Sequence, residues 1–305
     1  MARSSIKAKN NSSMVLKKES SLMKIQKVGI VGCGQMGGGI AQVCAQAGYT
    51  ILVSESTREL LQKGLAGIAA SLERSVKKQN ITSQEKDAVL ARITGTTDAA
   101  DFHECDLVIE AVSEVLDLKK RLFTQLDRIC PAHALLATNT SSLSVADIAS
   151  ATGRPDKVLG LHFFNPVPSL KLMEIVTAPT TSQATMQAGK GFAKTLGKTA
   201  VIVQDSPGFI VNRLMAPQIL NAIRLVESGV AAKEDIDTAM MLGLNHPIGP
   251  LALADLIGLD TLLTIADSIY DKLGDSQYAA PETLKKLVAA GHLGRKTGSG
   301  FYEYL

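Results

Sequence analysis

Short apolar segments alternate with amphipathic segments from residue 27 onward. The apolar segments are continuous rather than alternating, which is typical of strands buried on both faces of a sheet. Strands that alternate with helices indicate a doubly wound, mostly parallel sheet. The pattern therefore predicts an α/β fold. The expected strands are residues 27–31, 50–54, 106–112, 134–140, 158–164, 170–176 and 199–203, and the clearest helices between them are 58–78 and 116–129.

Helical periodicity replaces the strand pattern after Pro207. Glycine and proline separate the helical segments, as at Gly249-Pro250, where one helix is expected to stop and the next to start. We therefore expect a sheet domain over residues 23–206 and an all-helical domain over 207–305. Apolar helical faces in the second domain suggest contact with a second copy, so a homodimer is expected. The expected helices are 208–228, 233–242, 250–257, 260–273 and 281–290.

The first 22 residues differ in composition from the rest of the chain. They are rich in Ser, Lys and Asn, their only acid is Glu19, and Met23 lies just before the first expected strand. We therefore expect residues 1–22 to be a disordered tail and the protein to be cytoplasmic. A transit segment for the mitochondrial matrix is the alternative, although such segments carry more Arg and an apolar helical face.

Charge and cysteine spacing exclude several classes of protein. The formal net charge is only +3 and no basic stripe with interleaved aromatic residues is present, so nucleic-acid binding is not expected. No apolar run reaches the roughly 18 residues that span a bilayer, so no membrane segment is expected. The four cysteines lack CxxC spacing, so neither disulfides nor a metal site is expected.

A glycine-rich motif joins the first expected strand to the helix that follows it. The motif is GCGQMG, from Gly32 to Gly37. Gly32 permits a tight turn, Gly34 lets a pyrophosphate approach the backbone, and Gly37 lets the helix pack closely on the strand. The helix N-terminus offers free amides and a partial positive charge to phosphates. The motif predicts a Rossmann-like dinucleotide site that includes Gln35 and Met36; a structural turn without a ligand is the alternative.

The identity of the dinucleotide depends on Glu55, the acid that follows the second expected strand. Its carboxylate can accept hydrogen bonds from a ribose diol and repels a 2′-phosphate. NAD is therefore the expected cofactor. Arg58 lies close enough in the sequence to keep NADP as the less favoured alternative, and no other feature of the chain indicates FAD.

His162 and Glu174 lie in two expected strands that only a short loop separates. Strands this close can pair as an antiparallel hairpin, and a turn centred near Pro168 places the two residues opposite each other on one face. A carboxylate beside an imidazole favours the charged imidazole and fixes which nitrogen carries the proton. Such a pair can take a proton from a hydroxyl group. Each residue taken alone is more typical of a satisfied core position, since an unpaired buried charge is costly.

Two further polar segments lie where they can reach a ligand. Asn139 to Ser142, with the sequence NTSS, follow an expected strand, and ligands of open α/β sheets gather beyond the carboxyl ends of strands. These serines can instead cap the helix expected from Val145, and the two roles can belong to different residues. Asn212 lies at the head of the long helix after Pro207, where its amide can bond a substrate oxygen or remain an ordinary helix residue.

In combination these segments resemble the L-3-hydroxyacyl-CoA dehydrogenases, including the short-chain 3-hydroxybutyryl-CoA enzymes. The resemblance runs from about residue 25 to the C-terminus, and its motifs are the glycine loop, NTSSL, GLHFFNPVP, DSPGFIVNR and GRKTGSGFYEY. The departures lie mainly in residues 80–105 and in the N-terminal tail. The resemblance implies NAD-dependent oxidation of an L-3-hydroxyacyl-CoA to the 3-ketoacyl-CoA, or the reverse reduction, with the acyl-CoA in a cleft between the two domains.

The resemblance also implies the catalytic roles. His162 would be the general base toward the substrate hydroxyl, and Glu174 would orient it and stabilise its cationic form. Ser141 would hydrogen-bond the reacting oxygen, and Asn212 would complete the polar surroundings from the helical domain. Closure of the cleft would exclude water from the reaction.

Cofactor and CoA contacts follow by the same analogy. Glu55 would hold the adenosine ribose, and Glu114 and Lys119 would lie along the nicotinamide half. Asn139 and Lys296 would also lie at the cofactor. A cation is suited to the phosphates of CoA, although each proposed CoA contact can also be read as an ordinary surface or turn residue. The matching positions are Ser71, Lys78 (with Lys77 as its alternative) and Asn165.

Two other functions remain open from the sequence. A β-hydroxyacid or 6-phosphogluconate-type dehydrogenase has a similar cofactor domain and a helical second domain, but uses a lysine as its acid/base group. A non-catalytic, crystallin-like nucleotide-binding protein would keep the fold, and it predicts a broken His–Glu pair or an altered glycine loop. The sequence keeps both features. It does not reveal the preferred acyl length or the physiological direction.

Overall fold

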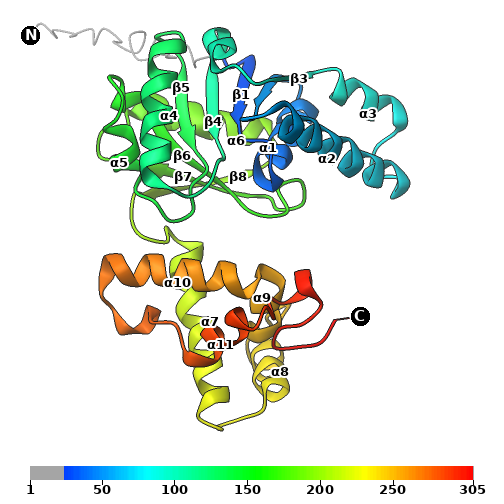
Figure 1. Cartoon of the computed structure of the whole chain (residues 1–305), viewed down its shortest axis with the longest axis vertical. Coiled ribbons are helices and arrows are strands. Elements are labelled where there is room, and N and C mark those ends of the chain that lie inside the picture. Colours follow the sequence, from blue (N-terminus) through cyan, green and yellow to red (C-terminus); the bar gives the residue numbers. More distant parts are fainter. Residues whose placement is uncertain (1–23, 305) are drawn as a thin grey trace, which may run out of the picture.

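A computed structural model describes residues 24–304, so the tail expected at residues 1–22 lies outside the described part of the chain. The described chain begins with a helix-covered sheet and continues as a separate group of helices (Figure 1). This arrangement confirms the predicted α/β class with a helical C-terminal region.

Eight strands form one sheet in the order β3-β2-β1-β4-β5-β6-β7-β8. Strands β1 to β6 are parallel, whereas β7 runs antiparallel to β6 and carries β8 parallel to itself. The carboxyl ends of the parallel strands therefore share one edge, where ligands of such sheets gather. The strands are β1 (Lys27–Val31), β2 (Thr50–Ser54), β3 (Ile93–Thr96), β4 (Leu107–Glu110), β5 (Leu135–Thr138), β6 (Val158–Phe163), β7 (Leu172–Thr177) and β8 (Thr199–Gln204).

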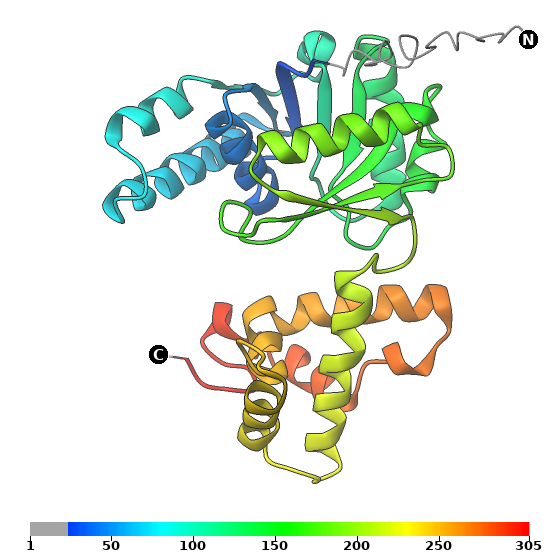
Figure 2. The same ribbon diagram turned by 180° about the vertical axis from the view of Figure 1, so that it is seen from behind.

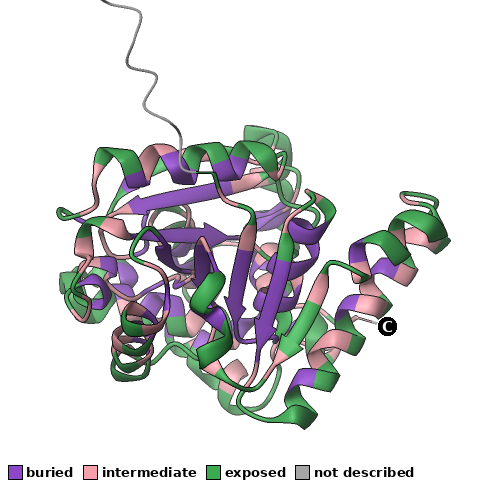
Figure 3. Cartoon of the chain, turned by 90° about the horizontal axis from the view of Figure 1, so that it is seen from above, coloured by how far each residue is buried: buried purple, intermediate pink, exposed green. Residues whose placement is uncertain are grey.

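Helices cover both faces of the sheet (Figure 2). Helices α1, α2 and α6 pack on one face, and α4 and α5 pack on the other. The apolar sequence of the central strands follows from this double cover, because both of their faces are buried (Figure 3). The helices are α1 (Gln35–Gln46), α2 (Arg58–Lys77), α3 (Ser83–Leu90), α4 (Leu116–Ile129), α5 (Val145–Ala149) and α6 (Gln183–Thr195), with short 3-10 helices η1 (Ala99–Glu104) and η2 (Pro155–Lys157).

The C-terminal region is helical and has its own apolar core, to which Ile223 and Leu262 belong. None of the helices in the described residues is both long enough and apolar enough to cross a membrane. The elements are α7 (Val211–Glu227), α8 (Lys233–Leu244), α9 (Pro250–Ile257), α10 (Leu259–Leu273) and α11 (Glu282–Ala289), with short 3-10 helices η3 (Ser276–Tyr278) and η4 (Arg295–Thr297).

The C-terminal segment is tied to this region by a buried acid, Asp255. Its carboxylate accepts hydrogen bonds from the backbone amides of Phe301 and Tyr302, each at 2.9 Å, and from the hydroxyl of Tyr304 at 2.9 Å. Burial of a carboxylate is tolerated when donors satisfy it. The motif GRKTGSGFYEY therefore contributes contacts that hold the end of the helical region in place.

Besides the short 3-10 helices, one strand and two helices of the described residues were not predicted by the hydrophobic pattern. Strand β3 is a short edge strand with the sequence ITGT, so it lacks a continuous apolar run. Helix α3 begins with a capping box in which Thr82 and Glu85 bond each other's backbone amides, a local signal that the sequence carries. Helix α6 follows the N-cap Ser182, whose hydroxyl accepts from Thr185.

Candidate active site

The glycine loop connects β1 to α1 at the carboxyl edge of the sheet. Gly32 has a positive φ of 94°, and a Cβ there would lie 2.8 Å from the backbone oxygen of Ala111. A Cβ on Gly37 would lie 1.9 Å from the backbone oxygen of Gly32. A Cβ on Gly34 would meet no atom within 4 Å, and no side chain of the N-cap closes the first turn of α1. The loop therefore keeps one open side beside free helix amides, as a pyrophosphate requires.

Glu55 and Gln35 link this loop to the rest of the edge. The Glu55 carboxylate accepts from the backbone amide of Cys33 at 2.7 Å and from that of Ser56 at 3.1 Å. The Gln35 side-chain amide donates to the side-chain oxygen of Asn165 at 3.2 Å. Asn165 belongs to the loop between β6 and β7, so the two loops of the site contact each other directly.

The pairing of β6 with β7 places His162 opposite Glu174, as the short loop between them predicts. The imidazole Nδ1 lies 2.7 Å from Glu174 Oε2. His162 is 5% exposed and Glu174 is 1% exposed, so the pair is nearly shielded from water. The ring of His162 also lies against Phe164 and meets Phe209 edge-on, with centroid separations of 4.4 and 5.5 Å. Two aromatic rings and one carboxylate thus fix the imidazole.

The second carboxylate oxygen of Glu174 contacts the helical region. Oε1 accepts from the backbone amides of Ile210 and Val211 at 3.1 and 3.0 Å, at the N-terminus of α7. The positive end of a helix stabilises a carboxylate in this position. Asn212 is the next residue of α7 and is 7% exposed. Asn212 therefore directly follows the residues that contact the His162–Glu174 pair.

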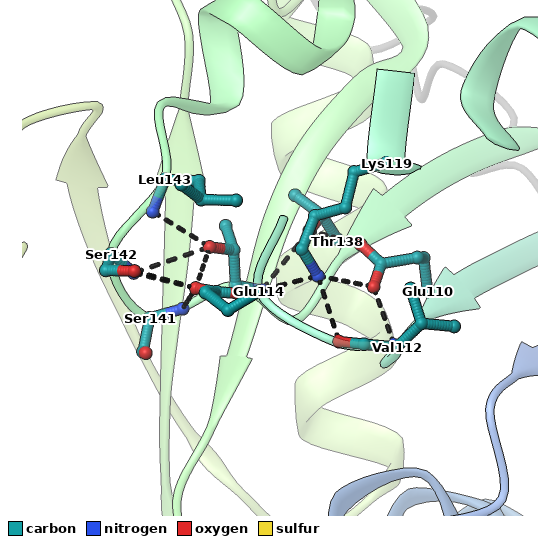
Figure 4. A network of polar contacts seen from close by, with 9 residues as sticks. Glu110, Val112, Glu114, Lys119, Thr138, Ser141, Ser142 and Leu143 are labelled. Atoms are coloured by element: carbon teal, nitrogen blue, oxygen red, sulfur yellow. Dashed lines mark hydrogen bonds and ion pairs between the residues drawn. The ribbon is translucent and has the colours of Figure 1, made fainter. Parts of the chain in front are cut away.

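Ser141 lies in the loop after β5, which the carboxylate of Glu114 organises (Figure 4). Glu114 Oε1 accepts from the backbone amides of Ser141 and Ser142 at 2.9 and 3.1 Å, from the Ser142 hydroxyl at 2.9 Å and from the Thr140 hydroxyl. Burial raises the pKa of Glu114, but the nearby Lys119 and these hydrogen bonds outweigh burial and hold the pKa below its usual range. Glu114 is therefore a carboxylate anion whose hydrogen bonds hold residues 140–142 of the loop in one conformation.

The NTSS serines do not cap the helix that begins at Val145. The cap is Ser144, two residues beyond that segment, whose hydroxyl accepts from the amide of Asp147. Asn139 bonds the neighbouring strand instead, since its side-chain oxygen accepts from the backbone amide of Phe163 at 3.0 Å. The segment thus binds the end of β5 to the strand that carries His162.

Comparison with known proteins identifies the family. Residues 27–206 match the family described as 3-hydroxyacyl-CoA dehydrogenase, NAD binding domain, and residues 208–304 match the corresponding C-terminal domain. The chain belongs to the 3-hydroxyacyl-CoA dehydrogenase family. It is accordingly an oxidoreductase, and its sheet domain is of the nicotinamide-binding type.

Individual relatives cover nearly all of the chain. The chain is 48% identical to a 3-hydroxybutyryl-CoA dehydrogenase of Mycobacterium tuberculosis, over 92% of this chain and 99% of that protein. It is 46% identical to the mitochondrial hydroxyacyl-coenzyme A dehydrogenase of Rattus norvegicus, over 92% of this chain and 91% of that protein.

Solved structures agree with this assignment. The crystal structure of FadB2 from M. tuberculosis has a TM-score of 0.90 at 47% identity, covering 92% of this chain and 99% of that one. The (S)-3-hydroxybutyryl-CoA dehydrogenase PaaH1 from Ralstonia eutropha has a TM-score of 0.88 at 45% identity, covering 92% of this chain and 100% of that one.

The remaining residues that the dehydrogenase resemblance assigns lie apart from the His162 pair. Ser71 is half-buried in α2 and Lys78 is exposed at its C-terminal end. Lys296, in the helical region, pairs with Asp260, and one of the two contacts measures 2.6 Å. Within residues 24–304, no hydrogen bond or ion pair connects these three to His162 or Glu174.

Lys119 and a residue that the sequence analysis missed form a buried ion pair. Lys119 is 1% exposed, and its ammonium lies 2.5 Å from Glu110 Oε1 and 3.2 Å from Glu114 Oε2. Glu110 is fully buried at the end of β4. The signal for Glu110 is the same as that for Glu174, an acid inside an apolar strand, which requires a partner. The described residues hold no cluster of three metal-ligating side chains.

The open space at Gly34 generates a prediction about cofactor binding. Gly34→Val introduces a side chain that meets no protein atom at its Cβ and needs no positive φ, since φ is −71°. We expect only a small fall in the unfolding temperature, because the added Cβ meets no protein atom and the main cost is a poorer N-cap residue. The dissociation constant for NADH, measured by fluorescence titration, is expected to rise at least about tenfold because the phosphates lose their approach to the backbone.

Gly37→Ala is the matched comparison, because its Cβ would collide with the backbone of Gly32. This variant is expected to lose stability as well as NADH binding. Parent-like NADH affinity in Gly34→Val would show that the phosphates lie elsewhere.

Proposed function

We propose that the chain catalyses the NAD-dependent oxidation of L-3-hydroxyacyl-CoA to 3-ketoacyl-CoA, and the reverse reduction, for example of acetoacetyl-CoA to 3-hydroxybutyryl-CoA. The names of the relatives support the substrate class. The observation that carries the proposal is the buried contact between His162 and Glu174 at the carboxyl edge of the sheet. A carboxylate that only accepts leaves the shared proton on Nδ1, which makes Nε2 the nitrogen with a free lone pair.

The reaction then divides between the cofactor and this imidazole. A bound nicotinamide dinucleotide supplies the acceptor for the hydride that leaves the substrate carbon. The substrate hydroxyl proton passes to Nε2 of His162 as the carbonyl forms. The Glu174 carboxylate stabilises the resulting imidazolium, and the α7 amides keep that carboxylate in place. In the reverse direction His162 returns the proton to the ketone oxygen.

Ser141 and Asn212 are proposed as donors to the reacting oxygen. Among the described residues, neither side chain makes a hydrogen bond of its own, so both remain available to a substrate. They come from opposite domains, since Ser141 follows β5 and Asn212 lies in α7. Donors held by a rigid frame stabilise the charge that develops on oxygen in the transition state.

Contacts to the cofactor and to CoA are proposed by analogy with the family. Glu55, which follows β2 and holds the amide of Cys33, is proposed to bind the adenosine ribose diol and to favour NAD over NADP. The other residues proposed for the cofactor are Gly32, Gly34, Gln35, Met36, Gly37, Glu114, Lys119, Asn139 and Lys296. Those proposed for CoA are Ser71, Lys78 and Asn165.

We also propose a separate role for each domain. Residues 23–206 would bind the dinucleotide and residues 207–305 would close the substrate cleft and form a homodimer contact. The helical region exposes several large apolar side chains that a second copy could cover. The most exposed of them are Leu214, Val230, Leu242 and Leu244.

Replacement of the proposed base gives the first test. In His162→Gln, NADH consumption with acetoacetyl-CoA is expected to fall by about three orders of magnitude in kcat, because the variant loses the proton carrier and its electrostatic help. His133→Gln is the matched control, since His133 lies 3.0 Å from Asp106 in an exposed His–carboxylate pair. The control is expected to keep parent activity, and an active His162→Gln enzyme would remove His162 from the mechanism.

The choice between NAD and NADP is tested at Glu55. The parent enzyme is expected to use NADH with a kcat/KM about 100-fold above that for NADPH, because the carboxylate repels a 2′-phosphate. Glu55→Ser is expected to raise the KM for NADH about tenfold and to reduce that preference. Glu59→Ser, an exposed acid in the next helix, is the control and should change neither value. Equal use of both cofactors by the parent would refute the assignment.

The homodimer is tested by sedimentation velocity. The parent chain is expected to sediment at twice its mass of 32.3 kDa. Leu242→Glu places a charge on a side chain that is 80% exposed in one copy, and it is expected to weaken the dimer at least about tenfold if a partner covers it. Leu60→Glu, at 45% exposure in the sheet domain, is the control. A parent chain that sediments as a monomer would contradict the proposal.

A further inference from the structure

Glu110 is a buried acid to which neither the family resemblance nor the proposed mechanism gives a role. It is the last residue of β4, it has no exposed surface, and both of its carboxylate oxygens accept hydrogen bonds. A buried charge is costly unless it is fully paired. The hydrogen-bond partners of its two carboxylate oxygens indicate its role.

The first oxygen of Glu110 leads to Glu114 through a lysine. Oε1 accepts from the backbone amide of Val112 at 2.7 Å and from the Lys119 ammonium at 2.5 Å. The same ammonium lies 3.2 Å from Glu114 Oε2 (Figure 4). Lys119 comes from α4, so the helix, the strand end and the loop after the strand meet at one cation.

The second oxygen of Glu110 leads to Glu114 through two threonines. Oε2 accepts from the Thr138 hydroxyl at 2.8 Å. The Thr138 hydroxyl oxygen accepts from the backbone amide of Thr140 at 3.2 Å. The Thr140 hydroxyl in turn donates to Glu114 Oε1. Both oxygens of Glu110 are therefore connected to the two oxygens of Glu114 by separate routes.

The two routes end on the residue that holds the Ser141 backbone. Glu114 Oε1 accepts from the amide of Ser141, while the Ser141 hydroxyl points away from the network in Figure 4. Glu114 thus fixes the backbone from which the Ser141 side chain projects.

We propose that Glu110 is a positioning residue for the dehydrogenase reaction, which aims the Ser141 hydroxyl through Lys119, Thr138 and Glu114. The inference rests on the proposed role of Ser141 as a donor to the reacting oxygen. The network holds two carboxylates and one ammonium. Removing the Glu110 charge releases the Lys119 ammonium from its shortest contact and leaves it with Glu114, at 3.2 Å, and the backbone oxygen of Val112, at 3.3 Å. Glu114 then shifts toward the ammonium and takes the Ser141 amide with it.

The test is a double-mutant cycle that uses Glu110→Gln and Ser141→Ala. Glu110→Gln alone is expected to lower kcat for acetoacetyl-CoA reduction about 10-fold or more, because a donor displaced by a fraction of an ångström is costly. Ser141→Ala alone is expected to lower kcat about 100-fold, with KM little changed. In the Ser141→Ala background, Glu110→Gln is expected to lower kcat less than about twofold, since the hydroxyl that it aims is already gone.

The outcomes separate this inference from the proposed function. If Glu110→Gln lowers kcat by the same factor in both backgrounds, Glu110 does not act through Ser141 and the inference fails while the role of Ser141 stands. If Ser141→Ala alone keeps the parent rate, the proposed role of Ser141 fails and the inference falls with it. Glu104→Gln is the matched control, because Glu104 forms a pair with Lys27 at 2.8 Å on the surface.

A second variant covers the case in which Glu110→Gln does not fold. Thr138→Val removes only the hydroxyl that joins Glu110 to Thr140 and leaves the ion pair with Lys119 intact. It is expected to lower kcat about threefold to tenfold in the parent background and less than about twofold in Ser141→Ala. Equal factors in the two backgrounds would overturn the inference here as well.

Discussion

The carboxylate of Glu174 is buried, and each of its oxygens has donors from a different part of the chain. One oxygen contacts the imidazole of His162 from the neighbouring strand, and the other accepts hydrogen bonds from the amides of Ile210 and Val211 at the N-terminus of α7. A buried carboxylate without these partners would be strongly destabilising. The position of the helical region and the orientation of the imidazole therefore depend on the same charge. Asn212 directly follows the two residues whose amides Glu174 holds.

The same device recurs along the carboxyl edge of the sheet. Glu55 accepts the amide of Cys33 in the glycine loop, Glu110 accepts the amide of Val112, and Glu114 accepts the amides of the Ser141 loop. In each case the carboxylate of an acid near the end of a strand accepts hydrogen bonds from backbone amides of a loop, which have no partner in the sheet. Loops usually carry mobile functional groups. These acids give the loops of the site fixed conformations without adding regular structure.

Sequence reasoning succeeds where a residue's environment depends on its neighbours along the chain. The strands near Ile30 and Ile109, the turn at Gly32 and the pairing of His162 with Glu174 all follow from short apolar runs and a short loop. It fails where the partner is distant or the pattern is weak. The strand β3 pairs at an edge and needs little apolar sequence.

Glu110 illustrates a different failure, because its signal was present. The strand DLVIEAV contains an acid between apolar residues, just as LKLMEIV does, yet only the second has a histidine in the paired strand to suggest chemistry. The partner of Glu110 is Lys119, nine residues later in a helix, and periodicity alone reads that lysine as part of a solvated face. The structure instead buries it. The partner of an acid in a buried strand can therefore be a cation in the next helix as well as a residue in the next strand. In this chain Lys119 is that cation, and it connects Glu110 in the sheet to Glu114, which holds the loop of Ser141.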